Sequence, residues 1–103
     1  MYSKLFEPGK IGKLTLKNRI AMAPMGVGAL AELDGSLSQR GIDYYVARAK
    51  GDVGLIITGL MRVTRELEQF PNVPFLRNPV LDNIVYLSWL NELAEAVHDY
   101  QAK

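Results

Sequence analysis

Three stretches of the chain have the apolar patterns that are typical of β-strands. In residues 5–17, short alternating pieces flank a proline and two glycines, which predicts a small hairpin or an irregular lead-in. Residues 19–25 and residues 53–59 are short and almost wholly apolar. Runs of this kind suit strands that are covered on both faces, as in a parallel sheet. We therefore expect a hairpin followed by two buried strands.

Two other stretches have helical periodicity. Apolar side chains recur at helical spacing in residues 42–49, where Ser38 is placed to cap the helix and Gly51 to end it. Asp82 is the expected N-cap of a second helix, which the pattern extends to about Tyr100. The predicted apolar stripe of this second helix consists of Ile84, Leu87, Leu90, Leu93, Ala94 and Val97.

The order of strand, helix, strand and helix predicts an α/β fold with a parallel sheet. Two parallel strands with two helices do not close such a sheet, because both of its edges need cover. The pattern also stops after a helix, where a third strand is expected to begin. We therefore expect residues 1–103 to be the N-terminal part of a larger α/β protein. Residues 63–82 contain three prolines and no periodicity, and loops of that length are often functional.

The composition is that of an ordinary folded protein and argues against several classes of function. Of 103 residues, 49% are hydrophobic and 22% are charged, with 12 Lys and Arg against 11 Asp and Glu and a formal charge of +1. This balance favours neither nucleic acid nor an anionic membrane surface as a partner. The absence of cysteine excludes disulfides, thiolate metal sites and a cysteine nucleophile within the chain. With no secretory signal pattern and no apolar run near about 18 residues, we expect a cytoplasmic protein outside the membrane.

Three familiar kinds of site find little support in the sequence. Residues 26–31 match the loose dinucleotide pattern G-x-G-x-x-A, but Pro24 and the Asp34-Gly35 turn break the strand-to-helix context of a phosphate site. His98 is the single histidine and lacks paired carboxylates at ligand spacing, so no metal site is predicted and a helix-end histidine is the simpler interpretation. No serine lies in a G-x-S-x-G elbow, so no catalytic triad is predicted either.

A planar cofactor is the remaining candidate. The two predicted strands end on small residues, in APMG at 23–26 and in ITGL at 57–60. Ligands of parallel α/β sheets and barrels lie at the carboxyl ends of the strands. Glycine at such an end lets a flat ring approach the main chain and leaves N–H and C=O groups free to bond it. The alternative is that Gly26 and Gly59 only permit turns.

Three stretches together carry a resemblance to a known family. They are LFEPGKIGKLTLKNRIAMAPM at 5–25, YYVARAKGDVGLIITG at 44–59 and WLNELAEAVHDYQAK at 89–103. They resemble the Old Yellow Enzyme family of FMN-dependent oxidoreductases, above all the branch with 2-enoate reductases and 2,4-dienoyl-CoA reductases. The family fold is a (β/α)8 TIM barrel, and such barrels have about 250 residues. The resemblance implies that residues 1–103 are a partial FMN-binding barrel domain, with the lead-in hairpin and the first two strand–helix units.

The resemblance also implies a flavin site and a reaction. The end of the first strand would lie against the flavin ring, so Pro24, Met25 and Gly26 would be main-chain contacts and Gly59 would pack near the ring. The intact enzyme would move a hydride from NADH or NADPH through FMN to the C=C bond of an α,β-unsaturated carbonyl compound or enoate. The catalytic groups come from later strands, so no catalytic residue is implied within this chain. Any 4Fe-4S cluster or FAD of the full-length protein would likewise be held by other residues.

Several positions depart from the family pattern or call for a structural interpretation. Relatives often have Thr or Cys at the position of Gly26, where this chain has no side chain to tune the flavin. Relatives usually have glycine at the position of Gln101, where a left-handed backbone would cost about 1 kcal/mol, so either the turn differs or the residue has been altered. Asn18-Arg19 and Arg48 are expected in an ion-pair network at the foot of the strands rather than in catalysis.

Two further expectations concern surfaces. Phe70, Phe75 and Arg77 in the loop of residues 63–82 either line a substrate mouth or partner surface or are simply solvated. A second class of function also stays open, namely a non-catalytic small α/β binding module that self-associates through its strand edges. As part of a barrel, the isolated chain is expected to be inactive.

Overall fold

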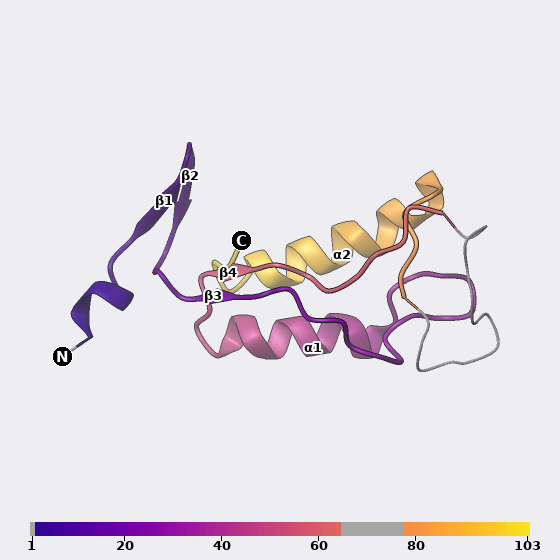
Figure 1. The fold of residues 1–103 in the computed structure, drawn as a ribbon, viewed down its shortest axis with the longest axis horizontal. Helices are drawn as coiled ribbons and strands as arrows, with labels where there is room; N and C mark the ends of the chain where they lie inside the picture. The colour runs from indigo at the N-terminus through magenta and orange to yellow at the C-terminus, as the bar shows by residue number, and fades with distance from the viewer. Residues whose placement is uncertain (1, 65–77) are drawn as a thin grey trace.

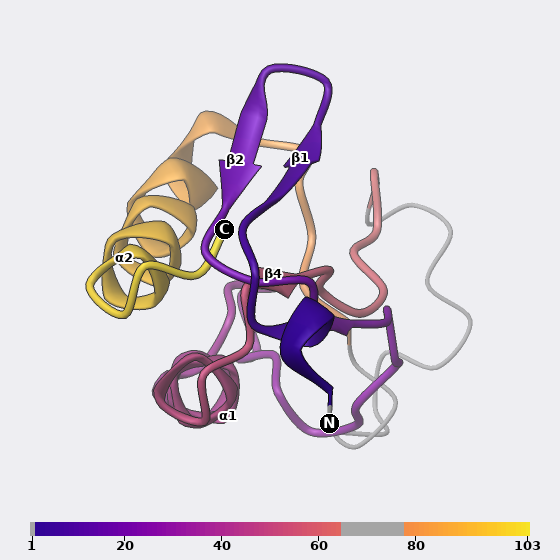
Figure 2. The same ribbon diagram turned by 90° about the vertical axis from the view of Figure 1, so that its left-hand side faces the viewer.

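The computed structural model describes residues 2–64 and 78–103. Along the chain, a hairpin is followed by a strand, a helix, a second strand and a second helix. The molecule is elongated, with the hairpin projecting from one end and the helices running along the strand pair (Figure 1). A view along the strands shows that both helices lie on the same side of them (Figure 2).

The N-terminal hairpin forms where the alternating pattern predicts it. After a single 3-10 turn, η1 (Ser3–Leu5), strand β1 (Gly9–Ile11) pairs antiparallel with strand β2 (Leu14–Leu16). Gly12 in the connecting turn has a φ of +58°, a left-handed conformation that glycine adopts without a steric penalty. The hairpin predicted over residues 5–17 is therefore confirmed.

The two central strands are parallel, as predicted, although they are shorter than the apolar runs. Strand β3 (Ala21–Met22) pairs with strand β4 (Leu55–Ile56), with Ala21 opposite Leu55 and Met22 opposite Ile56. At the carboxyl end of this ladder, the Ile57 N–H donates to the Met22 carbonyl at 3.1 Å. Beyond that bond the two chains run on without regular pairing.

The final residue, Lys103, lies along the edge of β4 that faces away from β3. The Lys103 N–H donates to the Gly54 carbonyl at 3.0 Å, and the Ile56 N–H donates to the Lys103 carbonyl at 2.7 Å. This pair of bonds is the pattern of a parallel ladder. The order of main-chain pairing is therefore β3, β4 and residue 103.

Helix α1 (Gln39–Lys50) has the bounds that its sequence signals predict. The Ser38 hydroxyl accepts a hydrogen bond from the Gly41 N–H at 3.2 Å, which is the side-chain cap expected at this position. Gly51 follows the last helical residue and ends the helix. The predicted apolar face of the helix packs into the core, where Ile42, Tyr45 and Ala49 are buried.

Helix α2 (Leu87–His98) begins later than predicted, and its buried face matches the predicted stripe only in part. Leu93 and Val97 are buried and Leu90 is partly buried, as expected, whereas Ile84 and Leu87 are exposed. The cap is Asn83 rather than Asp82, because the Asn83 side chain accepts from the Val85 N–H at 3.1 Å and opens a 3-10 turn, η3 (Ile84–Tyr86). A 3-10 turn advances three residues per turn and shifts the phase of the helix behind it. Ile84 is consequently 77% exposed. The buried face consists of Tyr86, Trp89, Leu93 and Val97.

The core lies between the two helices and the face of the strand pair that they cover. On the opposite face, Ala21 and Ala23 are exposed, and Ile57 is 47% exposed. The expectation that both strands are buried on both faces is therefore wrong in the described part of the chain. The physical reason is that both helices pack on one side, and among the described residues no helix covers the other side (Figure 2). The core consists of Leu30, Leu37, Ile42, Tyr45, Ala49, Val80, Tyr86, Trp89, Leu93, Val97 and Ala102.

Candidate functional site

The carboxyl ends of the two parallel strands meet at Met25 and Gly59. A Cβ added to Gly59 would overlap the Met25 carbonyl oxygen and would lie 3.0 Å from the Met25 carbonyl carbon. Only a residue without a side chain allows the two backbones to approach this closely. Gly59 is thus required by contact between the strand ends and not only by a turn.

The main-chain N–H of Gly59 is already engaged. It donates to the hydroxyl of Tyr45 at 2.9 Å, and Tyr45 is a core residue with 4% of its surface exposed. The expectation that both strand ends offer free main-chain groups to a ring is therefore wrong for this N–H. The sequence gives no signal for the bond, because an i, i+14 contact from a helix to a strand end follows only from tertiary packing.

The end of β3 is open, in contrast to Gly59. Pro24 and Gly26 are exposed, and Met25 is 56% exposed. Within residues 2–64 and 78–103, the N–H groups of Met25 and Gly26 have no hydrogen-bond partner. The main chain of residues 24–26 therefore presents unpaired polar groups on an accessible surface, which is the property that a flat polar ring requires of a binding wall.

Gly26 itself is not held by close packing. A Cβ at this position would approach the end of the Leu60 side chain at 3.2 Å, and that end can move.

Behind the strand ends, Val27, Leu30, Tyr45 and Gly59 line a cavity of about 10 Å³, room for about one water molecule. A ligand at these strand ends must therefore lie on the accessible side of residues 24–26.

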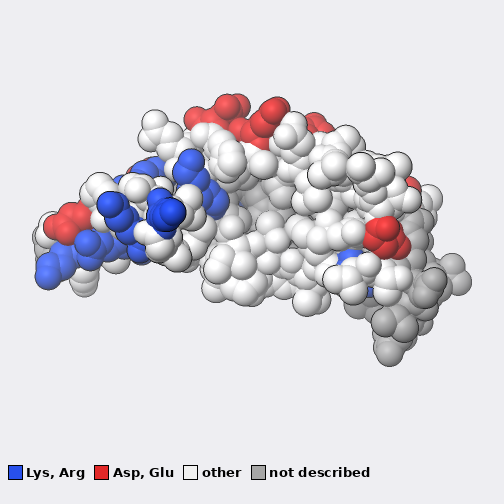
Figure 3. Space-filling model, turned by 90° about the horizontal axis from the view of Figure 1, so that it is seen from above, with Lys and Arg blue, Asp and Glu red and all other residues white. Residues whose placement is uncertain are grey.

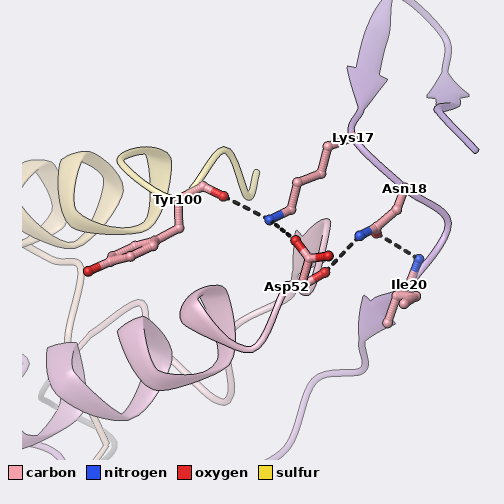
Figure 4. A network of polar contacts seen from close by, with 5 residues as sticks. All are labelled: Lys17, Asn18, Ile20, Asp52 and Tyr100. Carbon is pink, nitrogen blue, oxygen red and sulfur yellow. Dashed lines mark hydrogen bonds and ion pairs between the residues drawn. The ribbon is translucent and has the colours of Figure 1, made fainter. Parts of the chain in front are cut away.

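The amino ends of the strands are built differently, from side chains. Asn18, which is 3% exposed, donates from Nδ2 to the Asp52 carbonyl at 2.7 Å and accepts from the Ile20 N–H at 3.1 Å. Lys17 bridges the Asp52 carboxylate at 2.7 Å and the Tyr100 carbonyl at 2.8 Å. Figure 4 shows how this network joins the hairpin, the α1–β4 turn and the end of α2. We call it the foot network.

The ion-pair network expected for Arg19 and Arg48 is confirmed only in part. Arg19 forms an exposed ion pair with Glu7 at 3.6 Å, a kind of pair that contributes little to stability. Arg48, which was expected in the same network, instead lies over the Tyr44 ring at 3.7 Å and donates to the Tyr44 carbonyl at 3.0 Å. Its place in α1, next to Tyr44 one turn earlier, favours stacking over pairing with an acid.

Gln101 adopts the left-handed conformation that its position predicts. Its φ is +60°, and its N–H donates to the His98 carbonyl at 2.8 Å, so the local turn follows the expected path. Asp52 in the foot network is also left-handed, with a φ of +71°. Two residues with side chains thus accept backbone strain at the foot of the strands, each at a cost of about 1 kcal/mol.

Positive charge gathers at the hairpin end of the molecule. Figure 3 shows Lys and Arg over the hairpin and a broad uncharged area beside it. The basic residues of this end are Lys4, Lys10, Lys13, Lys17 and Arg19. These five residues lie in or next to the hairpin, toward the amino ends of the strands.

Other predicted site residues carry less information. His98 is the exposed last residue of α2, and no group of three His, Cys, Asp or Glu suited to a metal ion occurs in the described ranges. Phe70, Phe75 and Arg77 lie outside the described residues. No helix among the residues that the structure describes is long and apolar enough to cross a membrane.

Comparison with known proteins identifies the family. The model of the NADH:flavin oxidoreductase / NADH oxidase family matches residues 4–103. The chain belongs to this family. Among curated relatives, it is 51% identical to the NADH oxidase of Thermoanaerobacter brockii over 102 residues and 44% identical to the cinnamate reductase of Clostridium sporogenes over 102 residues. Each match covers 99% of this chain and 15% of the relative, so the chain spans under a sixth of their length.

Solved structures give the same answer for the fold. The structure of a 2-naphthoyl-CoA reductase is similar to this chain, with a TM-score of 0.84 and 26% sequence identity. The match covers 99% of this chain and 15% of the reductase chain. The Old Yellow Enzyme of Trypanosoma cruzi has a TM-score of 0.77 and 29% sequence identity. Its match covers 98% of this chain and 25% of the enzyme chain. The resemblance to Old Yellow Enzymes is confirmed, and the chain has the fold of the N-terminal part of their TIM barrels.

Proposed function

We propose that this chain forms one wall of the FMN site in an NAD(P)H-dependent flavin oxidoreductase. The main chain of Pro24, Met25 and Gly26 would lie against the flavin ring, and Gly59 would support it from behind. The convergence of Met25 and Gly59, with unpaired N–H groups on the accessible side, is the observation that supports this assignment. Carboxyl strand ends are the usual place for ligands in this fold.

The residues of this chain would bind and orient rather than react. When bound, FMN supplies the redox chemistry, which moves a hydride from NADH or NADPH to a C=C bond. The Met25 and Gly26 N–H groups can donate to ring acceptors, while Pro24 keeps the strand end rigid and has no N–H of its own. Gly26 leaves the surface without a hydroxyl or thiol, so this chain offers main-chain donors alone at that point.

The proposed substrate class is an α,β-unsaturated carbonyl compound or enoate. The names of two similar proteins, a cinnamate reductase and a 2-naphthoyl-CoA reductase, support this class. No residue of this chain is proposed as the acid or as the carbonyl-polarising donor. A 4Fe-4S cluster or FAD in a longer protein would also be held by other residues.

Residues 1–103 are proposed to be a partial barrel domain that is inactive by itself. The exposed face of β3 and β4 supports this proposal, because parallel sheets are ordinarily covered on both faces. Titration of FMN with the isolated chain, followed by flavin fluorescence, tests it directly. Stoichiometric tight binding together with NADH turnover would contradict the proposal.

The flavin wall itself is testable in a full-length enzyme. In a chimera, residues 2–103 replace the matching segment of the 51%-identical NADH oxidase from Thermoanaerobacter brockii. We expect the chimera to retain flavin, and we expect Gly26→Leu to lower its flavin content because the side chain would occupy the accessible side of the strand end. Gly28→Leu, at an exposed glycine two residues further on, is the matched control. A chimera that folds without flavin would contradict the assignment.

A second candidate function is supported by the same uncovered face. Apolar residues such as Ile57 and the edge of β4 beside Lys103 could pair with a second copy, which would make the chain a self-associating binding module. Light scattering after size-exclusion chromatography distinguishes the two functions. A discrete oligomer of fixed size that melts cooperatively favours the self-associating module, whereas aggregates of mixed size favour a barrel segment.

A further inference from the structure

The end of β4 is fastened by a side chain from helix α1. The regular ladder between the strands ends with the bond from the Ile57 N–H to the Met22 carbonyl. Two residues later, the Gly59 N–H donates to the Tyr45 hydroxyl at 2.9 Å. The phenol therefore takes the place of a strand partner at the point where main-chain pairing has stopped.

The position of Gly59 in turn determines that of Met25. The Met25 carbonyl lies against the Gly59 Cα so closely that no Cβ fits between them, and the Gly26 Cα is also adjacent. This contact blocks a shift of Gly59 toward Met25, and the hydrogen bond to Tyr45 restrains the Gly59 N–H. The peptide between Met25 and Gly26 is thus supported from behind by a side chain that does not reach its accessible side.

Tyr45 is well placed to act as a fixed support. It is 4% exposed, and its ring packs edge-to-face on Tyr44 with centroids 5.2 Å apart. Arg48 covers the other ring, that of Tyr44. A hydroxyl held by a buried ring of this kind loses little additional freedom when it accepts the Gly59 N–H, so the bond defines a position.

We propose that Tyr45 is a positioning residue of the flavin wall. Its hydroxyl sets the place of the Met25–Gly26 peptide through Gly59 and also withholds the Gly59 N–H from the ligand. The inference rests on the proposed flavin site. The competing interpretation is that Tyr45 only fills the core and that its hydroxyl contributes to stability without affecting the strand end.

The test compares Tyr45→Phe with Tyr44→Phe in the full-length chimera. Both variants keep a ring of the same size. Among the described residues, Tyr44 makes no hydrogen bond to either strand end, so Tyr44→Phe controls for the loss of a phenol from α1. For Tyr45→Phe, the FMN dissociation constant is expected to rise by about 2- to 12-fold, the equivalent of one hydrogen bond. The absorption maximum and midpoint potential of the bound flavin are expected to move, because the donors that face the ring move. Tyr44→Phe is expected to leave all three unchanged.

A measurement without flavin separates the inference from the proposed function. In the chimera from which flavin has been removed, amide hydrogen exchange at Gly59 is expected to be several-fold faster in Tyr45→Phe than in Tyr44→Phe. If the Gly59 amide is released while the flavin affinity, spectrum and potential of the Tyr45→Phe chimera stay at their original values, Tyr45 is a core residue only and the inference is overturned. If the unmodified chimera folds but holds no flavin, the proposed site itself is wrong, and the inference falls with it.

Discussion

The two ends of the β3–β4 pair use opposite means to hold the strands together. At the amino ends, the foot network joins three segments through the side chains of Lys17, Asn18 and Asp52. At the carboxyl ends, backbone meets backbone at Met25 and Gly59, and the hydroxyl of Tyr45 joins α1 to that end by a hydrogen bond. Side chains thus join the segments at one end, while main chain stays accessible at the other, where barrels of this type bind their ligands.

The largest expected effect comes from adding one methyl group at the carboxyl ends. Gly59→Ala places a Cβ onto the Met25 carbonyl, which is backbone and cannot move aside, so we expect the free energy of unfolding to fall by about 3 kcal/mol. Urea unfolding of the 103-residue chain, followed by the fluorescence of buried Trp89, measures this. Gly26→Ala is the matched control, because its Cβ meets only the mobile end of Leu60 and should cost little. Equal losses in the two variants would show that the strand ends are not in the described contact.

A smaller loss is expected when the foot network loses its buried amide. Asn18→Ala leaves the Asp52 carbonyl and the Ile20 N–H without their partner, which should destabilise the chain by about 2 kcal/mol. Asn91→Ala removes an exposed amide that bonds only Glu95 on the same helix, and we expect a change within about 0.5 kcal/mol. The same urea titration applies. A loss at Asn18 no greater than at Asn91 would remove the foot network as a source of stability.

The foot should also contain strain that can be relieved. Gln101→Gly is expected to stabilise the chain by about 1 kcal/mol, because glycine adopts a φ of +60° without the cost that glutamine bears. Asp99→Gly, two residues earlier at a φ of −57°, should destabilise it by a similar amount through the greater freedom of the unfolded chain. Thermal midpoints of the two variants test this contrast. If both variants are destabilised, Gln101 is not strained.

The smallest effect is expected for the ion pair of the network. Lys17→Met removes the contact with Asp52, whose side chain is 68% exposed, so we expect a loss of about 0.5 kcal/mol at low salt that shrinks at 1 M salt. Lys13→Met, in the same hairpin, should change stability at neither salt concentration, because Lys13 forms no ion pair with another described residue. A salt-independent loss at Lys17 would assign the effect to its bond with the Tyr100 carbonyl instead.

Elements whose bounds depend on residues within one turn could be predicted from the sequence. Features that depend on contacts with distant segments could not. Ser38 and Gly51 mark α1 correctly because caps act within one turn of their own position. Asn83 displaced Asp82 as a cap because the 3-10 turn ahead of α2 is chosen by packing of Tyr86 and Trp89 in the core. The sequence alone allows Arg48 either to form an ion pair with an acid or to stack on an aromatic ring. In the structure it stacks on the Tyr44 ring, one turn earlier in the same helix.

By itself, the sequence determined the order of elements, the parallel pairing, the family and the apolar runs that contain the two strands, since periodicity, caps and glycines are local properties. Tertiary structure alone decided that Gly59 lies against the Met25 carbonyl, that Tyr45 claims the Gly59 N–H, and that one face of the strands is left uncovered. These are contacts between segments distant along the chain. They depend on where two helices come to rest on a sheet, and no pattern in a single segment records that.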